Sequence, residues 1–125
     1  MVDDEKGRSG DPAPKLIFAC SGAADVGRVA DMAARTMTRD GIGSMFCLAG
    51  VGGRVEGILE RTASAARILA IDGCSLECAG QCLQQAGFGD FAHLRLDRLG
   101  MEKGQTPPAG ETIQRVVQAG SELLA

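Results

Sequence analysis

Short apolar runs alternate along the chain with longer segments whose apolar residues fall at helical spacing. Lys15–Ala19 and Arg67–Ile71 are apolar runs typical of buried strands, and Ser44–Leu48 and Phe91–Leu96 indicate two more strands. The positions that predict four helices are Val26, Val29, Ala30, Ala33 and Met37, then Val55, Ile58, Leu59 and Thr62, then Leu76, Ala79, Leu83 and Ala86, and finally Ile113, Val116, Val117, Leu123 and Leu124. The first of these helices is expected to end near Asp40, and the third at Gly87.

A strand followed by a helix, repeated four times, is typical of an α/β protein with parallel strands and right-handed crossovers. We therefore predict a small three-layer α/β/α domain over residues 15–125, with a mostly parallel four-stranded sheet of the Rossmann-like or flavodoxin-like type. The order of the strands is left open. The charged, Gly/Pro-rich segment 1–14 is predicted to be a flexible arm, and the polar segment Gly100–Gly110 a loop.

Composition narrows the classes of partner. The formal net charge is −3, and the four Phe are the only aromatic side chains besides one His, so neither a basic patch nor a base-stacking platform indicates nucleic-acid binding. No apolar run approaches the roughly 20 residues needed to cross a bilayer. The start of the sequence shows no apolar signal region, so we expect a cytoplasmic protein that binds neither membranes nor nucleic acids.

The five cysteines indicate thiol chemistry, because cysteines in a reducing compartment are more often metal ligands or redox thiols than disulfides. Cys20, Cys47 and Cys74 are spaced 27 residues apart, and each follows or ends a predicted strand. The carboxyl ends of parallel strands share one edge of the sheet, where open α/β proteins bind ligands. These three thiols are therefore expected at one site.

Cys78 supplies a fourth thiol. It follows Cys74 by four positions, which on a helix would place both side chains on one face. Four thiolates around one ion form the closed tetrahedral arrangement of structural zinc. Cys82 lies one turn further along the same helix and is interpreted as a buried apolar filler. The residues thus predict a Zn²⁺ site formed by Cys20, Cys47, Cys74 and Cys78.

Several motifs resemble the DGC-domain family, which is named for an Asp-Gly-Cys triplet and whose members are proposed to bind zinc. The segments that carry the resemblance are Phe18–Gly22, Met45–Gly50, Ile71–Ala79 and Gly100–Gly104, and the likeness extends from about Lys15 to Ala125. The resemblance implies that Cys20, Cys47, Cys74 and Cys78 hold zinc. It implies no reaction or substrate.

Two other functions remain open from the residues alone. Cys74 near the start of a helix, with Cys78 as its partner, would suit a thiol redox or sulfur-transfer enzyme. Four thiolates would also suit an iron–sulfur cluster. The glycines of segment 49–53 match neither the dinucleotide fingerprint nor Walker A, and are interpreted as a turn that comes close to the cysteines. Asp72 is expected to accept backbone hydrogen bonds, and His93 to be an ordinary strand residue.

Overall fold

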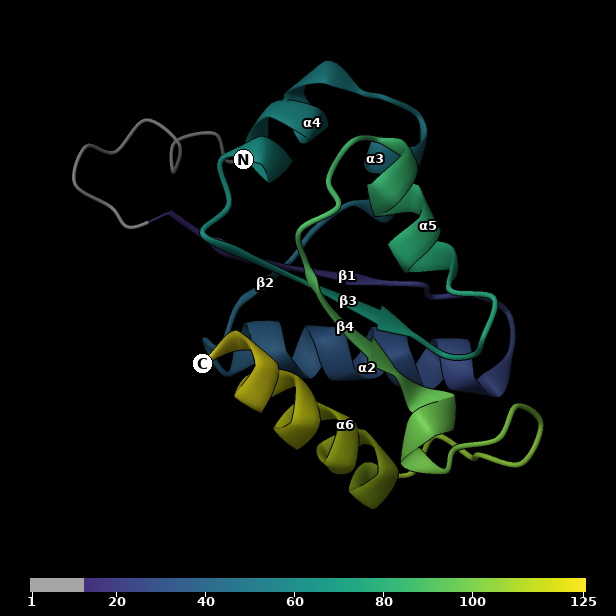
Figure 1. The fold of residues 1–125 in the computed structure, drawn as a ribbon. Coiled ribbons are helices and arrows are strands. Elements are labelled where there is room, and N and C mark those ends of the chain that lie inside the picture. The colour runs from purple at the N-terminus through teal and green to yellow at the C-terminus, as the bar shows by residue number, and fades with distance from the viewer. Residues whose placement is uncertain (1–12) are drawn as a thin grey trace.

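The computed structural model describes residues 13–125 and shows a parallel sheet between two layers of helices (Figure 1). Helices α2 and α6 cover one face of the sheet, and α3, α4 and α5 cover the other. The elements in chain order are β1 (Lys15–Ala19), α2 (Asp25–Arg39), β2 (Ser44–Met45), α3 (Leu48–Gly52), α4 (Glu56–Ala63), β3 (Arg67–Asp72), α5 (Cys78–Gln85), β4 (Ala92–Arg95), the 3-10 helix η1 (Leu96–Leu99) and α6 (Gly110–Leu124). The predicted three-layer α/β/α fold is confirmed.

Strand β1 is buried on both faces, and its residues alternate between the two apolar clusters. Leu16 and Phe18 pack toward α3 and α5, while Ile17 and Ala19 pack toward α2 and α6. All four are buried, and burying a large apolar side chain contributes about 1.5–3 kcal/mol. This packing holds the end of β1 in place, and with it the backbone of Cys20.

The strand order is β2-β1-β3-β4, and every pairing is parallel. Strand β1 pairs with β3 along its whole length, from Lys15 opposite Arg67 to Ala19 opposite Ile71. The chain leaves β1 for helix α2 on one face and leaves β3 for helix α5 on the other face (Figure 1). Connections that diverge from neighbouring strands open a crevice at their carboxyl ends, so this sheet has its switch point between β1 and β3.

Three predicted elements differ from the structure. The second strand is only two residues long, and Leu48 begins helix α3 instead of ending a strand. The glycine-rich segment expected to be a turn forms most of that helix. Leu76, expected on the buried face of the third helix, precedes α5 and is 66% exposed. The predicted loop Gly100–Gly110 is confirmed except for its last residue, which begins α6.

The predicted arm, residues 1–14, lies outside the described residues except for Ala13 and Pro14. The carbonyl oxygen of Pro14 accepts a hydrogen bond from the backbone N–H of Ala66 at 2.7 Å, just ahead of β3. Among the described helices, none combines the length and the apolar character needed to span a membrane.

Candidate functional site

Three of the five cysteines lie at or just beyond the carboxyl ends of three neighbouring strands. Cys20 directly follows β1, and its backbone N–H donates to the carbonyl oxygen of Ile71 in β3 at 3.0 Å. Cys47 and Cys74 each follow their strands, β2 and β3, by two positions. The predicted placement of these backbones along one edge of the sheet is confirmed. Their role as ligands stays a prediction.

The turn that carries Cys74 packs against the helix that follows Cys20. A Cβ atom at Gly73 would lie 2.7 Å from Cγ2 and 2.9 Å from Cβ of Val26, near the start of α2. Both distances are shorter than real carbon contacts, so only glycine fits here without a shift of the backbone. The Asp-Gly-Cys triplet thus permits the close approach of the segments that carry Cys20 and Cys74.

Cys74 and Cys78 do not share a helix face, so the spacing argument for the fourth ligand is wrong. Helix α5 begins at Cys78, and Cys74 lies in the turn before it. The carbonyl oxygen of Cys74 accepts a hydrogen bond from the N–H of Glu77 at 3.2 Å. Glu77 adopts the left-handed conformation with φ of 57°, which breaks any helix running from Cys74. Cys78 is exposed and Cys74 is partly buried.

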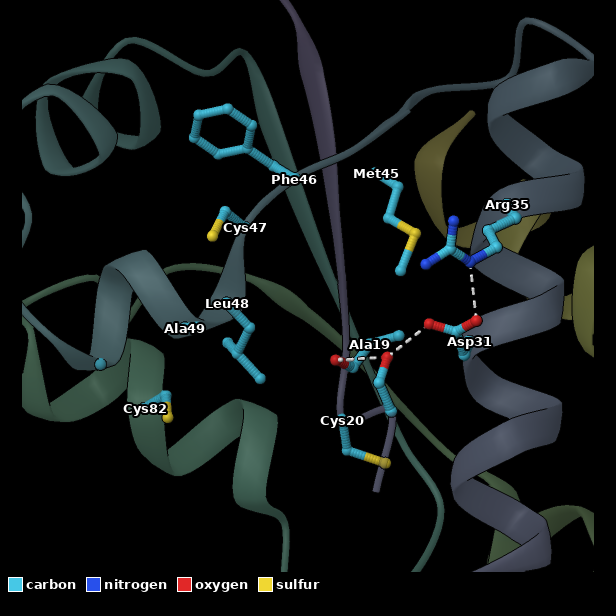
Figure 2. Close-up of a pocket in the computed structure, with 12 residues that line it drawn as sticks. Ala19, Cys20, Asp31, Arg35, Met45, Phe46, Cys47, Leu48, Ala49 and Cys82 are labelled. Carbon is cyan, nitrogen blue, oxygen red and sulfur yellow. Dashed lines mark hydrogen bonds and ion pairs between the residues drawn. The ribbon is translucent and has the colours of Figure 1, made fainter. Parts of the chain in front are cut away.

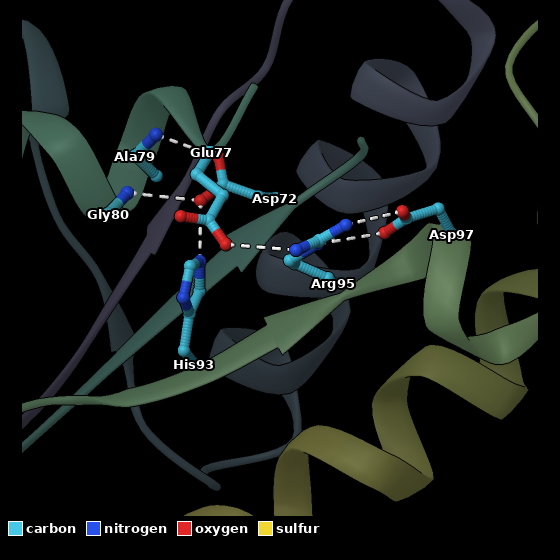
Figure 3. A network of polar contacts seen from close by, with 7 residues as sticks. All are labelled: Asp72, Glu77, Ala79, Gly80, His93, Arg95 and Asp97. Carbon is cyan, nitrogen blue, oxygen red and sulfur yellow. Dashed lines mark hydrogen bonds and ion pairs between the residues drawn. The ribbon is translucent and has the colours of Figure 1, made fainter. Parts of the chain in front are cut away.

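Asp72 explains why α5 begins where it does. Its carboxylate is 1% exposed and accepts the N–H groups of Ala79 and Gly80 at 2.7 and 3.0 Å, which are orphan donors of the first helical turn (Figure 3). Nε2 of His93 lies 2.7 Å from the same carboxylate. The predicted backbone-capping role of Asp72 is confirmed. His93 is more than an ordinary strand residue, because it supports the cap from β4.

A second polar contact holds the other side of the same turn. Arg95 of β4 forms two hydrogen bonds with Asp97, the shorter at 2.7 Å, and a third with Glu77 at 3.1 Å (Figure 3). The bidentate pair keeps the pKa of Asp97 below its usual range. Strand β4 therefore holds the segment from Asp72 to Glu77 at both ends, through His93 at Asp72 and through Arg95 at Glu77.

A pocket of about 740 Å³ opens beside the ends of β1 and β2 (Figure 2). Its thiol-bearing residues are Cys20, Cys47 and Cys82, and Met45, Phe46 and Leu48 supply apolar wall. The remaining lining residues are Ala19, Ser21, Asp31, Arg35, Ala49 and Gly52. Because β2 ends after two residues, the sheet does not extend into this space, and both helical layers reach it.

Cys82 is therefore not the buried filler that the sequence suggested. It is partly buried and lines the pocket from α5, and a Cβ atom at Gly52 would lie 3.6 Å from its sulfur. Cys47 lies at the other end of α3, where it is exposed and its sulfur accepts the N–H of Gly50 at 3.3 Å. A Cys caps this short helix in the position that Ser or Asp usually takes.

One rim of the pocket is polar. The hydroxyl of Ser21 donates to Asp31 at 2.7 Å, and Nε of Arg35 donates to the other oxygen of Asp31 at 2.7 Å. Partial burial alone would raise the pKa of Asp31, but the hydrogen bonds from Arg35 and Ser21 outweigh it and leave the pKa below its ordinary value. The rim thus carries a carboxylate and a guanidinium in a pocket that three cysteines also line.

The thiol donors suit zinc chemically, but they are not gathered around one point. Within residues 13–125, no three His, Cys, Asp or Glu side chains converge in an arrangement that could hold a metal ion. Cys20 and Cys47 face the pocket together with Cys82, whereas Cys74 and Cys78 are not among its lining residues. A four-thiolate site would therefore require the turn from Cys74 to Cys78 to move.

The segment Gly100–Gly104, one of the motifs noted in the sequence, begins a loop that is tied to the start of α2. The carboxylate of Asp25 accepts the N–H groups of Gly104 and Thr106, both at 2.9 Å, and that of Val26 at 2.8 Å. These backbone donors, that of Gly104 foremost, lower the pKa of Asp25. These hydrogen bonds hold the loop that begins with this motif against the start of α2, the helix that follows Cys20.

Comparison with known proteins identifies a family and a relative of this chain. The family model described as "DGC domain" matches residues 16–119. The chain is 40% identical over 93 residues to the anaerobic and virulence modulator AnvM of Pseudomonas aeruginosa strain PAO1. These 93 residues are 74% of this chain and 70% of AnvM. No solved structure matches. The match over residues 16–119, nearly the whole α/β domain, shows that this chain belongs to the DGC-domain family.

Proposed function

We propose that this protein binds Zn²⁺ through Cys20, Cys47, Cys74 and Cys78 at the carboxyl edge of its sheet. The observation that supports the proposal is the delivery of three cysteines by three neighbouring strand ends, with Cys20 joined directly to β3 through the carbonyl of Ile71. Thiolates are the donors that zinc prefers in closed protein sites. The DGC-domain family gives independent support, since its members are proposed to bind zinc.

Closure of this site would couple metal binding to a local rearrangement. Cys78 is exposed at the start of α5, and the turn before it would have to bring Cys74 and Cys78 toward Cys20 and Cys47. Metal binding that orders a segment contributes its free energy to that ordering. We therefore expect the zinc-bound protein to protect Cys78 from alkylation, although this thiol is exposed in the structure described.

The test is metal analysis of protein purified under reducing conditions without added metal. We expect about one zinc per chain, and loss of that zinc in each of the four single Cys→Ser variants at the proposed ligands. Cys82→Ser is the matched control and should retain the metal. Absence of metal from fresh reduced protein would refute the proposal. Loss of zinc in Cys82→Ser with retention in Cys78→Ser would indicate that the zinc site lies in the pocket lined by Cys20, Cys47 and Cys82.

A thiol-based regulatory role is the second candidate, favoured by the exposure of Cys47 and Cys78. The relative in Pseudomonas aeruginosa is named as a modulator, which agrees with regulation better than with catalysis. Because α5 begins at Cys78, this residue replaces Cys74 as the thiol at the helix start. Selective, rapid alkylation of Cys78 in protein shown to lack metal would favour this role. A brown colour after anaerobic purification would instead indicate an iron–sulfur cluster.

A further inference from the structure

The pocket beside β2 has the size of a small-molecule site and not of an ion site. Its volume is about 740 Å³, within the roughly 300–1,000 Å³ of ligand pockets. Such sites are mostly apolar with a few placed polar groups, and this one combines Met45, Phe46 and Leu48 with the pair formed by Asp31 and Arg35. It also lies at the carboxyl ends of β1 and β2, the edge of the sheet on which α/β proteins bind ligands, next to the switch point between β1 and β3.

The three thiols in this pocket indicate the chemistry of its ligand. Cys20 and Cys82 are partly buried, while Cys47 is exposed and its sulfur accepts the backbone N–H of Gly50. Figure 2 shows the side chains of the three cysteines among the residues that line the pocket. An exposed thiol on the wall of a pocket is placed to react with a molecule that the pocket holds. Arg35 at the rim is 69% exposed and pairs with Asp31 through Nε, so the two terminal NH2 groups of its guanidinium can still donate to an acidic group of a ligand.

We propose that this pocket binds a low-molecular-weight disulfide that carries carboxylate groups, and that Cys47 exchanges with it. The thiolate of Cys47 attacks one sulfur of the bound disulfide. The S–S bond of the ligand breaks, a mixed disulfide forms between Cys47 and one half of the ligand, and the other half leaves as a thiolate. That thiolate takes up the proton released when Cys47 ionised. The exchange needs no further oxidant or reductant.

This proposal goes beyond zinc binding but shares Cys47 with it. A metal held by Cys47 would block the exchange, so the experiment uses full-length reduced protein treated with a chelator and checked for metal content. The two proposals then fail separately. Absence of zinc from the purified protein would refute the first, and only the behaviour of the metal-free protein bears on the second.

Cys78 provides a matched control for the exchange. Both Cys47 and Cys78 are exposed and both stand at the start of a helix, but only Cys47 lines the pocket. A difference in their reactivity toward a disulfide therefore reports on the pocket and not on exposure. A second comparison uses Ala49, an exposed residue of α3 that lines the pocket, since Ala49→Leu would fill part of the space and leave every thiol in place.

The probe is glutathione disulfide, with adducts located by peptide mass spectrometry over time. We expect modification of Cys47 about tenfold faster than that of Cys78, with a rate at Cys47 that saturates as the probe concentration rises. Ala49→Leu should slow the modification of Cys47 and leave the rate of modification of Cys78 unchanged. Equal rates at the two cysteines, or a strictly linear concentration dependence at Cys47, would overturn the proposal. The saturation measurement uses the unaltered protein, so it decides the question even if Ala49→Leu folds poorly.

Discussion

The buried carboxylate of Asp72 offers the sharpest test of how the cysteine-bearing turn is held. Asp72→Ala would remove an acceptor that is 1% exposed and serves the N–H groups of Ala79 and Gly80 as well as Nε2 of His93. Asp72, Ala79 and Gly80 are all buried, so the two amides at the start of α5 would lose their partner inside the protein. The turn from Cys74 onward would lose its anchor as well.

The expected cost follows from these contacts. Loss of a helix N-cap costs about 0.5–2 kcal/mol, and each buried donor left without a partner costs about 1–3 kcal/mol. Because the three bonds converge on one carboxylate, their losses do not add in full. We expect Asp72→Ala to lower the free energy of unfolding by about 3–5 kcal/mol, a large fraction of the roughly 5–15 kcal/mol typical of a domain.

Urea denaturation followed by circular dichroism measures this change, since the chain has no Trp or Tyr to report by fluorescence. Asp31→Asn is the matched control. Its carboxylate pairs with Arg35 on the surface, at 22% and 69% side-chain exposure, and such pairs contribute about 1 kcal/mol or less. A loss below about 1 kcal/mol in Asp72→Ala, or equal losses in both variants, would refute the capping argument.

Three further predictions concern the same end of the sheet. Gly73→Ala should destabilise the protein by about 1–3 kcal/mol, because the added Cβ would collide with Val26 of α2. Gly57→Ala is the control: it has open space around it and should stabilise the protein slightly. Thermal unfolding of the two variants measures the difference. Folding lowers the pKa of Asp25 from 3.8, so its carboxylate contributes fully to stability above pH 3.8 and loses that contribution as the pH falls through the pKa of the folded protein. The difference in the free energy of unfolding between the unaltered protein and Asp25→Ala should therefore shrink on acidification. His93→Ala should cost about 1–3 kcal/mol in urea denaturation, and His93→Gln clearly less, since its amide N–H can still donate to Asp72.

The periodicity of the sequence predicted the sheet and its two layers because the strongest apolar patterns lie in the elements that carry the core. Strands β1 and β3 and helices α2 and α6 have the expected positions to within two or three residues. The second strand was overestimated because apolar residues after Met45 serve helix α3 and the pocket instead of a ladder. A local apolar run does not distinguish these environments.

The candidate site was predicted less completely, and the reasons are specific. The start of α5 depends on a carboxylate six residues upstream of it and on a left-handed Glu77, neither of which residue spacing reveals. The spacing therefore placed Cys74 and Cys78 on one helix face incorrectly. Cys82 was assigned to the core because a helix-face argument cannot show that β2 is short and leaves α5 facing a pocket.

Both proposals involve Cys20 and Cys47, because β1, which Cys20 follows, lies between β2 and β3. On one side of Cys20 lies the crevice of the switch point, where the turn with Cys74 packs against α2. On the other side lies the pocket that Cys20 and Cys47 share with Cys82. Two thiols that take part in a four-thiolate zinc site cannot at the same time face a bound disulfide. Metal occupancy and disulfide exchange should therefore exclude each other, because both draw on the same sulfur atom of Cys47.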